Sequence, residues 1–159
     1  MKIRTANLSD LAAIAAVEKK CFPASLAASE KDFKARLQAY PNHFWLLEDN
    51  GKLVGLIDGM VTNESTIRDA MYQDAHLHDE AGNWQAIFGV TVIPEYRKRG
   101  CAARLMKRVI SDAKAQGRKG CILTCEARLI PYYKKFGYTY SISVKKMGLN
   151  SYLLFTVTV

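Results

Sequence analysis

Residues 84–125 constrain the fold more than any other part of the chain. They begin with an apolar run, WQAIFGVTVI, that Pro94 closes, and they end with a second apolar run, GCILTC. Between the two runs, CAARLMKRVISDAKAQ carries apolar side chains on one stripe at helical spacing, and Gly117 follows it as a helix stop. Two buried strands joined by an amphipathic helix form a β-α-β unit. The sequence therefore predicts an α/β protein.

The remaining segments extend this unit into a larger sheet. Amphipathic patterning predicts helices at residues 9–22 and 29–40, a short helix at 127–136, and strands at 2–5, 43–49, 52–62, 138–144 and 152–159. Ser29 and Asp32 form a capping box, and Asn50-Gly51 suits a tight hairpin turn. We find no repeat, linker or low-complexity tract, so residues 1–159 are predicted to form one domain, an α/β sandwich around a mixed sheet. The last strand is apolar enough for a homodimer edge or a buried central strand.

Charge and cysteine content restrict the partners. The chain has 23 Lys and Arg against 15 Asp and Glu, a formal charge of +8, which favours an anionic partner. Neither an apolar run of membrane-spanning length nor a secretory h-region is present, so we expect no membrane association and a cytoplasmic location. The four cysteines lack metal-ligand spacing, so no metal is expected, and they are interpreted as buried thiols in a reducing compartment.

The densest positive charge, Arg97-Lys98-Arg99, lies between the first buried strand and the helix, and Gly100 follows it. The first N–H groups of a helix have no intrahelical partners and can converge on an anion. Gly100 can adopt a positive φ, and Cys101 and Ala102 are small enough for close approach. The arrangement suits a pyrophosphate, although RKRG alone would fit a solvated basic turn. It is neither a G-x-G-x-x-G fingerprint nor a P-loop.

Two segments resemble motifs of the GNAT superfamily of N-acetyltransferases. VTVIPEYRKRGCAARLM is similar to the acyl-CoA binding motif, and ILTCEARLIPYYKKFGY is similar to the companion motif that carries a catalytic tyrosine. The order of elements over essentially the whole chain also matches. The resemblance implies an α+β fold with a mixed, mostly antiparallel sheet and helices on both faces. VEKKCFP and LVGLIDG look most like the arylalkylamine (serotonin) N-acetyltransferase branch and its bacterial relatives.

The resemblance implies acetyl-CoA as cosubstrate and gives roles to particular residues. Around the phosphates it places Arg97, Lys98, Arg99, Gly100, Cys101 and Ala102. Backbone groups of Val90, Thr91 and Val92 would contact the pantetheine arm, as a peptide adds to a strand edge. The N–H near Val90 would stabilise the oxyanion, and Tyr133 would protonate the departing thiolate. Tyr132 beside it has the same spacing, and a core role is the alternative for Tyr133.

The general base is not identified by the motif. In the arylalkylamine branch a His-x-His precedes the cofactor loop, but the matching positions here are Ala86 and Phe88. His76-Leu77-His78 lies about ten residues too early. It is interpreted as a solvated loop, or as a loop over the acceptor site with Asp79 orienting an imidazole. Covalent catalysis by Cys101 or Cys125 would need a nearby histidine, which the sequence does not place.

The expected activity is direct transfer of an acetyl group to a small primary amine. The acceptor side would be lined by the first two helices and by the loop after the third strand. Candidate apolar wall or core residues are Phe22, Phe33, Phe44 and Trp45, and candidate acidic ones are Glu64, Asp69, Asp74, Asp79 and Glu80. A non-catalytic acyl-CoA-binding or sensing domain is the alternative. Nucleic-acid binding is not expected, because aromatic side chains do not interleave with the basic ones.

Overall fold

The computed structural model describes residues 1–147 and 150–158. Its strands are β1 (Lys2–Thr5), β2 (Phe44–Asp49), β3 (Lys52–Asp58), β4 (Val61–Thr62), β5 (Trp84–Ile87), β6 (Gly89–Val92), β7 (Gly120–Glu126), β8 (Thr139–Met147) and β9 (Asn150–Thr158). Its α-helices are α1 (Leu11–Cys21), α2 (Glu30–Ala39), α3 (Asp69–Gln73), α4 (Cys101–Ala115) and α5 (Ile130–Lys134). Within this described part, every helix is too short or too polar to span a bilayer.

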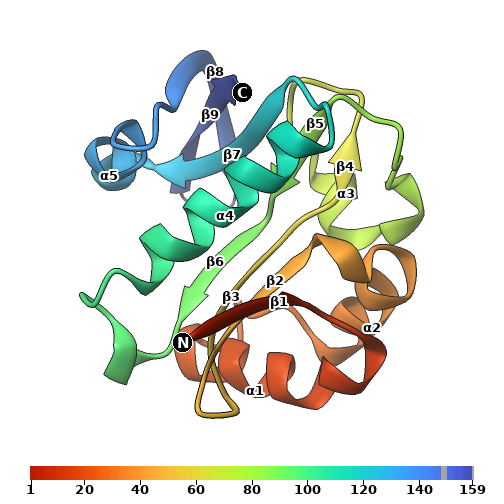
Figure 1. The fold of residues 1–159 in the computed structure, drawn as a ribbon. Coiled ribbons are helices and arrows are strands. Elements are labelled where there is room, and N and C mark those ends of the chain that lie inside the picture. Colours follow the sequence, from red (N-terminus) through yellow and green to blue (C-terminus); the bar gives the residue numbers. More distant parts are fainter. Residues whose placement is uncertain (148–149, 159) are drawn as a thin grey trace.

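The strands form two hydrogen-bonded ladders that share the β5–β6 segment of the chain (Figure 1). One has the order β1-β2-β3-β6, and the other has the order β4-β5-β7-β9-β8. Among the described strands, the β5–β7 pair alone is parallel, as the predicted β-α-β unit requires, and the other pairs are antiparallel. The predicted mixed, mostly antiparallel sheet is confirmed.

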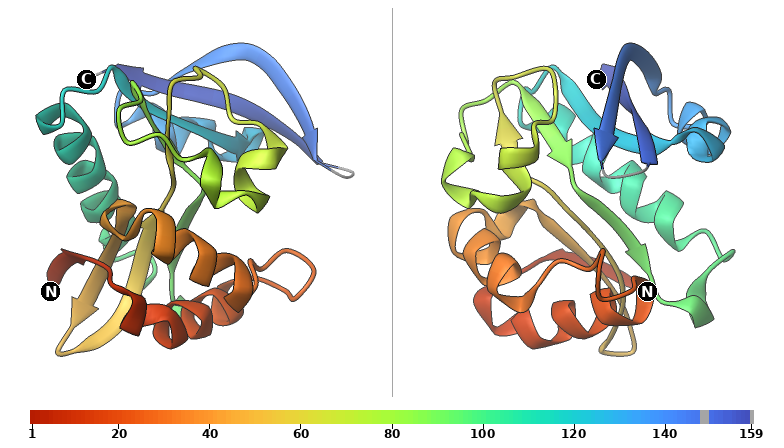
Figure 2. Two further views of the ribbon diagram at one scale, coloured as in Figure 1. Left: turned by 90° about the vertical axis from the view of Figure 1, so that its right-hand side faces the viewer. Right: turned by 180° about the vertical axis from the view of Figure 1, so that it is seen from behind.

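Helices cover both faces of the sheet (Figure 2). On β3, a Cβ added at Gly55 would lie 3.4 Å from Leu105 of α4, whereas the Asp58 side chain bonds to Arg36 of α2. Side chains an odd number of positions apart on a strand point to opposite faces. Helix α4 therefore packs on one face, and α1 and α2 pack on the other. The core between these layers includes Ile14, Phe33, Leu56 and Leu105.

Local sequence signals account for several element boundaries. Ser29 and Asp32 form the predicted capping box at the start of α2. Asn50 and Gly51 have φ of 50° and 80°, the left-handed conformations of a tight hairpin turn. Helix α3 was not predicted, since five residues are too short to show a helical period. The predicted strand 52–62 is divided into β3 and β4 at Gly59, where an added Cβ would overlap the Ala86 carbonyl oxygen.

The last strand lies inside the sheet. β9 pairs with β7 on one side and with β8 on the other, so β8 forms the edge. The alternative of a buried central strand therefore explains its apolar sequence, and residue 159 lies outside the described residues. A homodimer stays a prediction without support from this strand.

Candidate functional site

The chain leaves one ladder and joins the other at Phe88. β5 pairs with β7, but β6 continues beyond Phe88 as the edge of the other ladder. The Ile93 N–H donates to the Val54 carbonyl, and antiparallel pairing alternates bonded and non-bonded residues. Backbone groups of Val90 and Val92 therefore point away from β3, and those of Thr91 point toward it. The Val92 carbonyl accepts hydrogen bonds from Cys21 Sγ and Arg97 Nε on this open side.

This geometry refines the predicted pantetheine contacts. The Val90 N–H and C=O and the Val92 N–H lie on the open edge of β6, where an amide-bearing ligand could pair with them. The backbone of Thr91 is instead engaged in the ladder with β3, where Leu56 is its partner. Support for backbone contacts is thus restricted to Val90 and Val92. The group of Thr91 that remains available to a ligand is its buried side-chain hydroxyl, which has no hydrogen-bond partner among the described residues.

The predicted phosphate loop adopts the conformation that an anion site needs. Lys98 and Gly100 both have positive φ, 59° and 77°, and α4 begins at Cys101. The helix therefore presents its first N–H groups next to a loop whose three basic side chains are exposed. Arg99 lies over the Tyr96 ring at 5.0 Å, while Arg97 Nε is held by the Val92 carbonyl. Binding of phosphates by Arg97, Lys98, Arg99, Gly100, Cys101 and Ala102 stays a prediction.

Gly100→Val is expected to weaken acetyl-CoA binding about tenfold, because a β-branched residue resists the left-handed turn, at a cost of ~1–2 kcal/mol. Calorimetric titration of acetyl-CoA and chemical denaturation would measure the two effects. Gly117→Val is the matched control, because Gly117 has a φ of 76°, open space around it, and lies at the other end of α4. It should lose similar stability but retain affinity. Equal affinity loss in both variants would contradict a phosphate site at Gly100.

A cavity of about 480 Å³ opens where β6 and β7 diverge. Its walls come from α1, α2, α3, the β5–β6 junction, the end of β7 and α5. Apolar side chains in the wall include Phe22, Phe33, Ile87, Phe88, Leu123 and Leu129. Of the four predicted aromatic wall residues, Phe22 and Phe33 line the cavity. Phe44 and Trp45 are core residues with 0% and 1% exposure.

The structure distinguishes the two adjacent tyrosines. Tyr133 lines the cavity and is 7% exposed, whereas Tyr132 packs against the core outside the cavity wall. Burial raises the pKa of Tyr133 well above its ordinary value, and the neighbouring Cys125 and Tyr132 add to this effect. The phenol is therefore protonated at neutral pH and can donate a proton. Its role as general acid stays a prediction, now with a position in the cavity.

The cysteines are poorly suited to nucleophilic catalysis. Cys125 lines the cavity, but burial raises the pKa of its thiol to about 11. Cys101 is buried at the start of α4 beside Met1. Because the thiolate is the reactive species, the protonated Cys125 thiol favours direct transfer over an acyl-enzyme.

The acidic side chains of the cavity are not those that the sequence pattern indicated. Among the residues 64–80, Tyr72 and Gln73 reach the cavity, but none of the five candidate carboxylates does. The carboxylates that line it are Glu18, Asp32, Asp58 and Glu126. Glu18 lies four residues after Ile14, on the buried stripe of α1, and Asp58 interrupts an apolar strand. A charged residue on an apolar face was the available signal for both.

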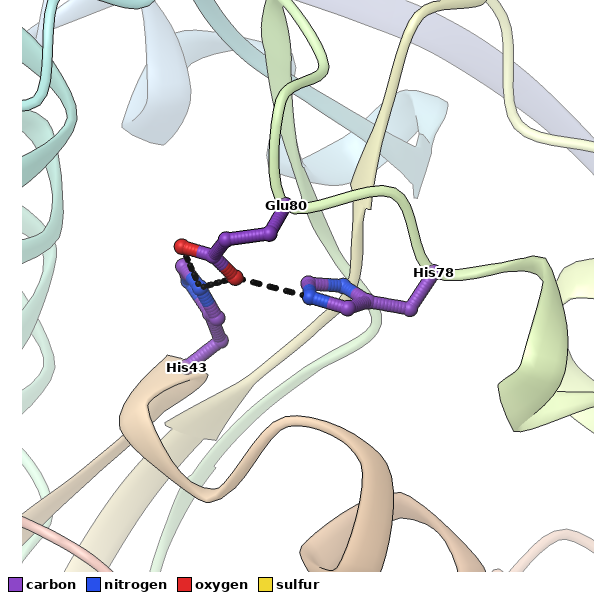
Figure 3. A group of neighbouring side chains, drawn as sticks. All are labelled: His43, His78 and Glu80. Atoms are coloured by element: carbon purple, nitrogen blue, oxygen red, sulfur yellow. Dashed lines mark hydrogen bonds and ion pairs between the residues drawn. The ribbon is translucent and has the colours of Figure 1, made fainter.

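The histidine motif lies away from the cavity. His78 packs against Tyr40 and His43, and Glu80 rather than Asp79 bonds to its ring (Figure 3). The alternative of a loop over the acceptor site is therefore wrong for His78, and so is a solvated position, because its side chain is 9% exposed.

His43, His78 and Glu80 bring three possible metal-ligating atoms within 4.8 Å of one another. Their hydrogen bonds argue against a metal site. The Val61 N–H donates to His78 Nδ1, so Nε2 carries the proton of the neutral ring and donates to Glu80 at 2.8 Å. For His78 Nε2 to bind a metal ion, the ring proton would have to move to Nδ1, where it would point at the Val61 N–H. The amide of Gln85 donates to three backbone carbonyls, so its oxygen accepts from His43 Nδ1.

Glu80 therefore joins three segments. Its carboxylate accepts from His78, pairs with Arg118 at 3.1 Å and lies 2.8 Å from His43 Nε2, although its own side chain is 67% exposed. Burial works to raise the pKa of Glu80, but its interactions with the two histidine rings outweigh burial, and the pKa lies below its ordinary 4.5. The contribution of Glu80 to stability is thus present above pH 4.5 and is lost as the pH falls through the lower folded value.

Glu80→Gln is expected to lower the free energy of unfolding by about 1 kcal/mol at pH 7, since it weakens charge-assisted hydrogen bonds at a partly exposed site. The difference from the parent should shrink as the pH falls below 4.5 and through the lower pKa of Glu80 in the folded protein, because the carboxylate then becomes neutral like the amide. Urea denaturation at pH 7 and at a series of lower pH values measures this difference. Glu64→Gln, which removes an exposed i,i+4 pair with Arg68, should cost less than half as much. A pH-independent difference would contradict this role.

Known proteins share this architecture. The chain aligns with the GphF GNAT-like decarboxylase in complex with isobutyryl-CoA at a TM-score of 0.83 and 20% identity, over 99% of both chains. It aligns with the ribosomal-protein-S18-alanine N-acetyltransferase from Escherichia coli at 0.73 and 17%, over 99% of this chain and 92% of that one. The values for yncA, a putative acetyltransferase from Salmonella typhimurium with acetyl-CoA, are 0.70 and 16%, over 99% and 93%.

These structural similarities show the fold. No curated protein gave a significant match to the chain. A model of the acetyltransferase (GNAT) domain matches residues 2–141, most of the chain. The chain therefore belongs to the GNAT acetyltransferase family, whose cosubstrate is acetyl-CoA.

Proposed function

We propose that this acetyltransferase transfers the acetyl group directly to the primary amine of a small cationic acceptor that also carries an apolar part. The observation that carries the proposal is the composition of the cavity wall. Four carboxylates and two guanidinium groups, those of Arg36 and Arg128, line the cavity, so acidic groups outnumber basic ones there although the formal charge of the chain is +8. Local charge opposite to that of the whole protein favours a cationic ligand. The aromatic side chains of Phe22, Phe33 and Phe88 would contact its apolar part.

The residues around the cavity suit each step of direct transfer. The acceptor nitrogen attacks the thioester carbonyl, and the Val90 N–H on the open edge of β6 would donate to the developing oxyanion. As the C–S bond breaks, Tyr133 would donate its phenol proton to the thiolate. The loop 97–102 would hold the phosphates at the far end of the cosubstrate. No covalent enzyme intermediate is needed, in agreement with the high thiol pKa of Cys125.

The proposal is tested by release of free thiol from acetyl-CoA across a panel of arylalkylamines, polyamines, amino acids and a peptide N-terminus. Turnover with a primary amine is expected. Preference for arylalkylamines would support the narrower assignment to the arylalkylamine-like branch. The three phenylalanines of the cavity favour this assignment, whereas the absence of the His-x-His pair weakens it. Tight acetyl-CoA binding without turnover on any amine would replace the proposal with the alternative of an acyl-CoA-binding or sensing domain.

We also propose a reducing, cytoplasmic compartment. All four cysteines are free thiols, and three of them are buried. Mass measurement of the protein from cell extract with and without alkylation after denaturation should show four alkylated thiols.

A further inference from the structure

Glu18 is a buried carboxylate in the cavity wall. It lies in the last turn of α1 and is 8% exposed. One carboxylate oxygen accepts a hydrogen bond from the Ala28 N–H at 3.2 Å. Among the side chains that the structure describes, those of residues 1–139 and 156–158, no lysine, arginine or histidine forms an ion pair with it. Burial of a carboxylate without a cationic partner is costly, so its presence calls for an explanation.

The other three carboxylates of the cavity have structural partners. Asp58 pairs with Arg36 at 2.9 Å, and Glu126 pairs with Arg128 at 2.9 Å. Asp32 accepts the Ser29 N–H in the capping box of α2. Asp32 is only partly buried, at the N-terminus of α2, so Glu18 is the buried carboxylate of the cavity for which no ion pair is described. It lies on the α1–α2 side, and Tyr133 lies on the α5 side of the same cavity.

We infer that Glu18 binds the ammonium group of the acceptor and acts as its general base. The inference rests on the proposed amine acetyltransferase function and names the base that the sequence motif did not identify. A buried carboxylate in a partly apolar wall attracts a cation and accepts its proton once the amine is desolvated. Asp58 cannot serve equally, because Arg36 occupies the partner position beside it.

The proton balance is as follows for the ammonium form of the acceptor. Glu18 takes one proton, and the freed lone pair forms the C–N bond while the C–S bond breaks. Tyr133 gives its proton to the thiolate. After the attack the nitrogen loses a second proton to solvent, and solvent returns a proton to the Tyr133 phenolate. Glu18 releases its proton to solvent, so the products are the amide, coenzyme A thiol and one proton.

Burial raises the pKa of Glu18 above its ordinary value, and the Ala28 N–H partly offsets this effect. Asp58 raises the pKa further, whereas Arg36 lowers it. Since the carboxylate form must accept the proton, kcat/KM should fall on the acid side at a pH above the ordinary glutamate value of 4.5. This acid limb is a readout that a purely structural glutamate would not give.

The test compares Glu18→Gln with the parent on the amine with the highest turnover. The glutamine oxygen can still accept the Ala28 N–H, so the local fold is retained. We expect kcat/KM to fall about 10²-fold and the acid limb to disappear, while the Kd of acetyl-CoA stays within twofold. Glu30→Gln, the same charge change at an exposed position of α2 outside the cavity, should leave all three quantities unchanged.

Glu18→Asp separates charge from packing. It keeps the carboxylate on a shorter side chain, so it should retain the acid limb and more activity than Glu18→Gln. An unchanged kcat/KM and pH profile in Glu18→Gln, or equal losses in both variants, would overturn the role of Glu18 and leave the acetyltransferase function standing. A parent enzyme that binds acetyl-CoA but acetylates no amine would overturn both proposals.

Discussion

Tyr133→Phe is expected to lower kcat about 10²-fold and to leave the Kd of acetyl-CoA within twofold, because only the proton donated to the thiolate is lost. The ring remains, and its edge-on packing against Tyr132 and Tyr138, at 5.2 and 6.0 Å, does not depend on the hydroxyl. Steady-state kinetics with the preferred amine and calorimetric titration of acetyl-CoA measure the two quantities.

Tyr132→Phe is the matched control. It removes the same atom one residue earlier, on a side chain that packs outside the cavity wall. Its kcat should stay within about twofold of the parent value. Since burial raises the pKa of Tyr133, the parent should show no alkaline loss of activity from this group below about pH 10. Equal kcat in the parent and Tyr133→Phe would remove the general-acid assignment and leave the rest of the site intact.

Much of the fold could be predicted because its signals are local. The hairpin at Asn50-Gly51, the capping box of α2 and the β-α-β unit each depend on residues close together in the sequence. The break at Phe88 could not be predicted in this way. β5 and β6 form one continuous apolar run, and their separation into two ladders depends on which strands pair with each half. That separation creates the open edge of β6 and the cavity.

In the candidate site, too, some parts are indicated by local sequence signals and others depend on contacts between distant segments. The cofactor loop and Tyr133 lie in contiguous motifs, so a resemblance could indicate them. The cavity proposed for the acceptor is assembled from segments that include α1, α2, the end of β3 and the end of β7, which together span more than a hundred residues of the sequence. The acidic run at residues 64–80 was chosen for its proximity in sequence, and none of its carboxylates lines the cavity. Glu18 and Asp58 were visible only as charges on apolar faces.

The pair of Arg36 and Asp58 provides the largest expected effect on stability. The two side chains are 8% and 3% exposed, and Arg36 also donates to the Tyr72 carbonyl and lies over the Phe33 and Phe88 rings. Asp58→Ala would leave a buried guanidinium without its counter-ion. We expect the free energy of unfolding to fall by about 3–5 kcal/mol, as measured by urea denaturation.

The double variant Arg36→Met with Asp58→Ala tests the reason for that loss. Once neither charge is present, no ion remains buried unpaired, so the double variant should be more stable than Asp58→Ala alone. Additive losses would instead show that packing, not charge, accounts for the effect. The double variant also leaves the formal charge of the cavity unchanged, because it removes one positive and one negative group. Retention of amine turnover in it would therefore locate the recognition of the cation at the remaining carboxylates, among which Glu18 is the buried one.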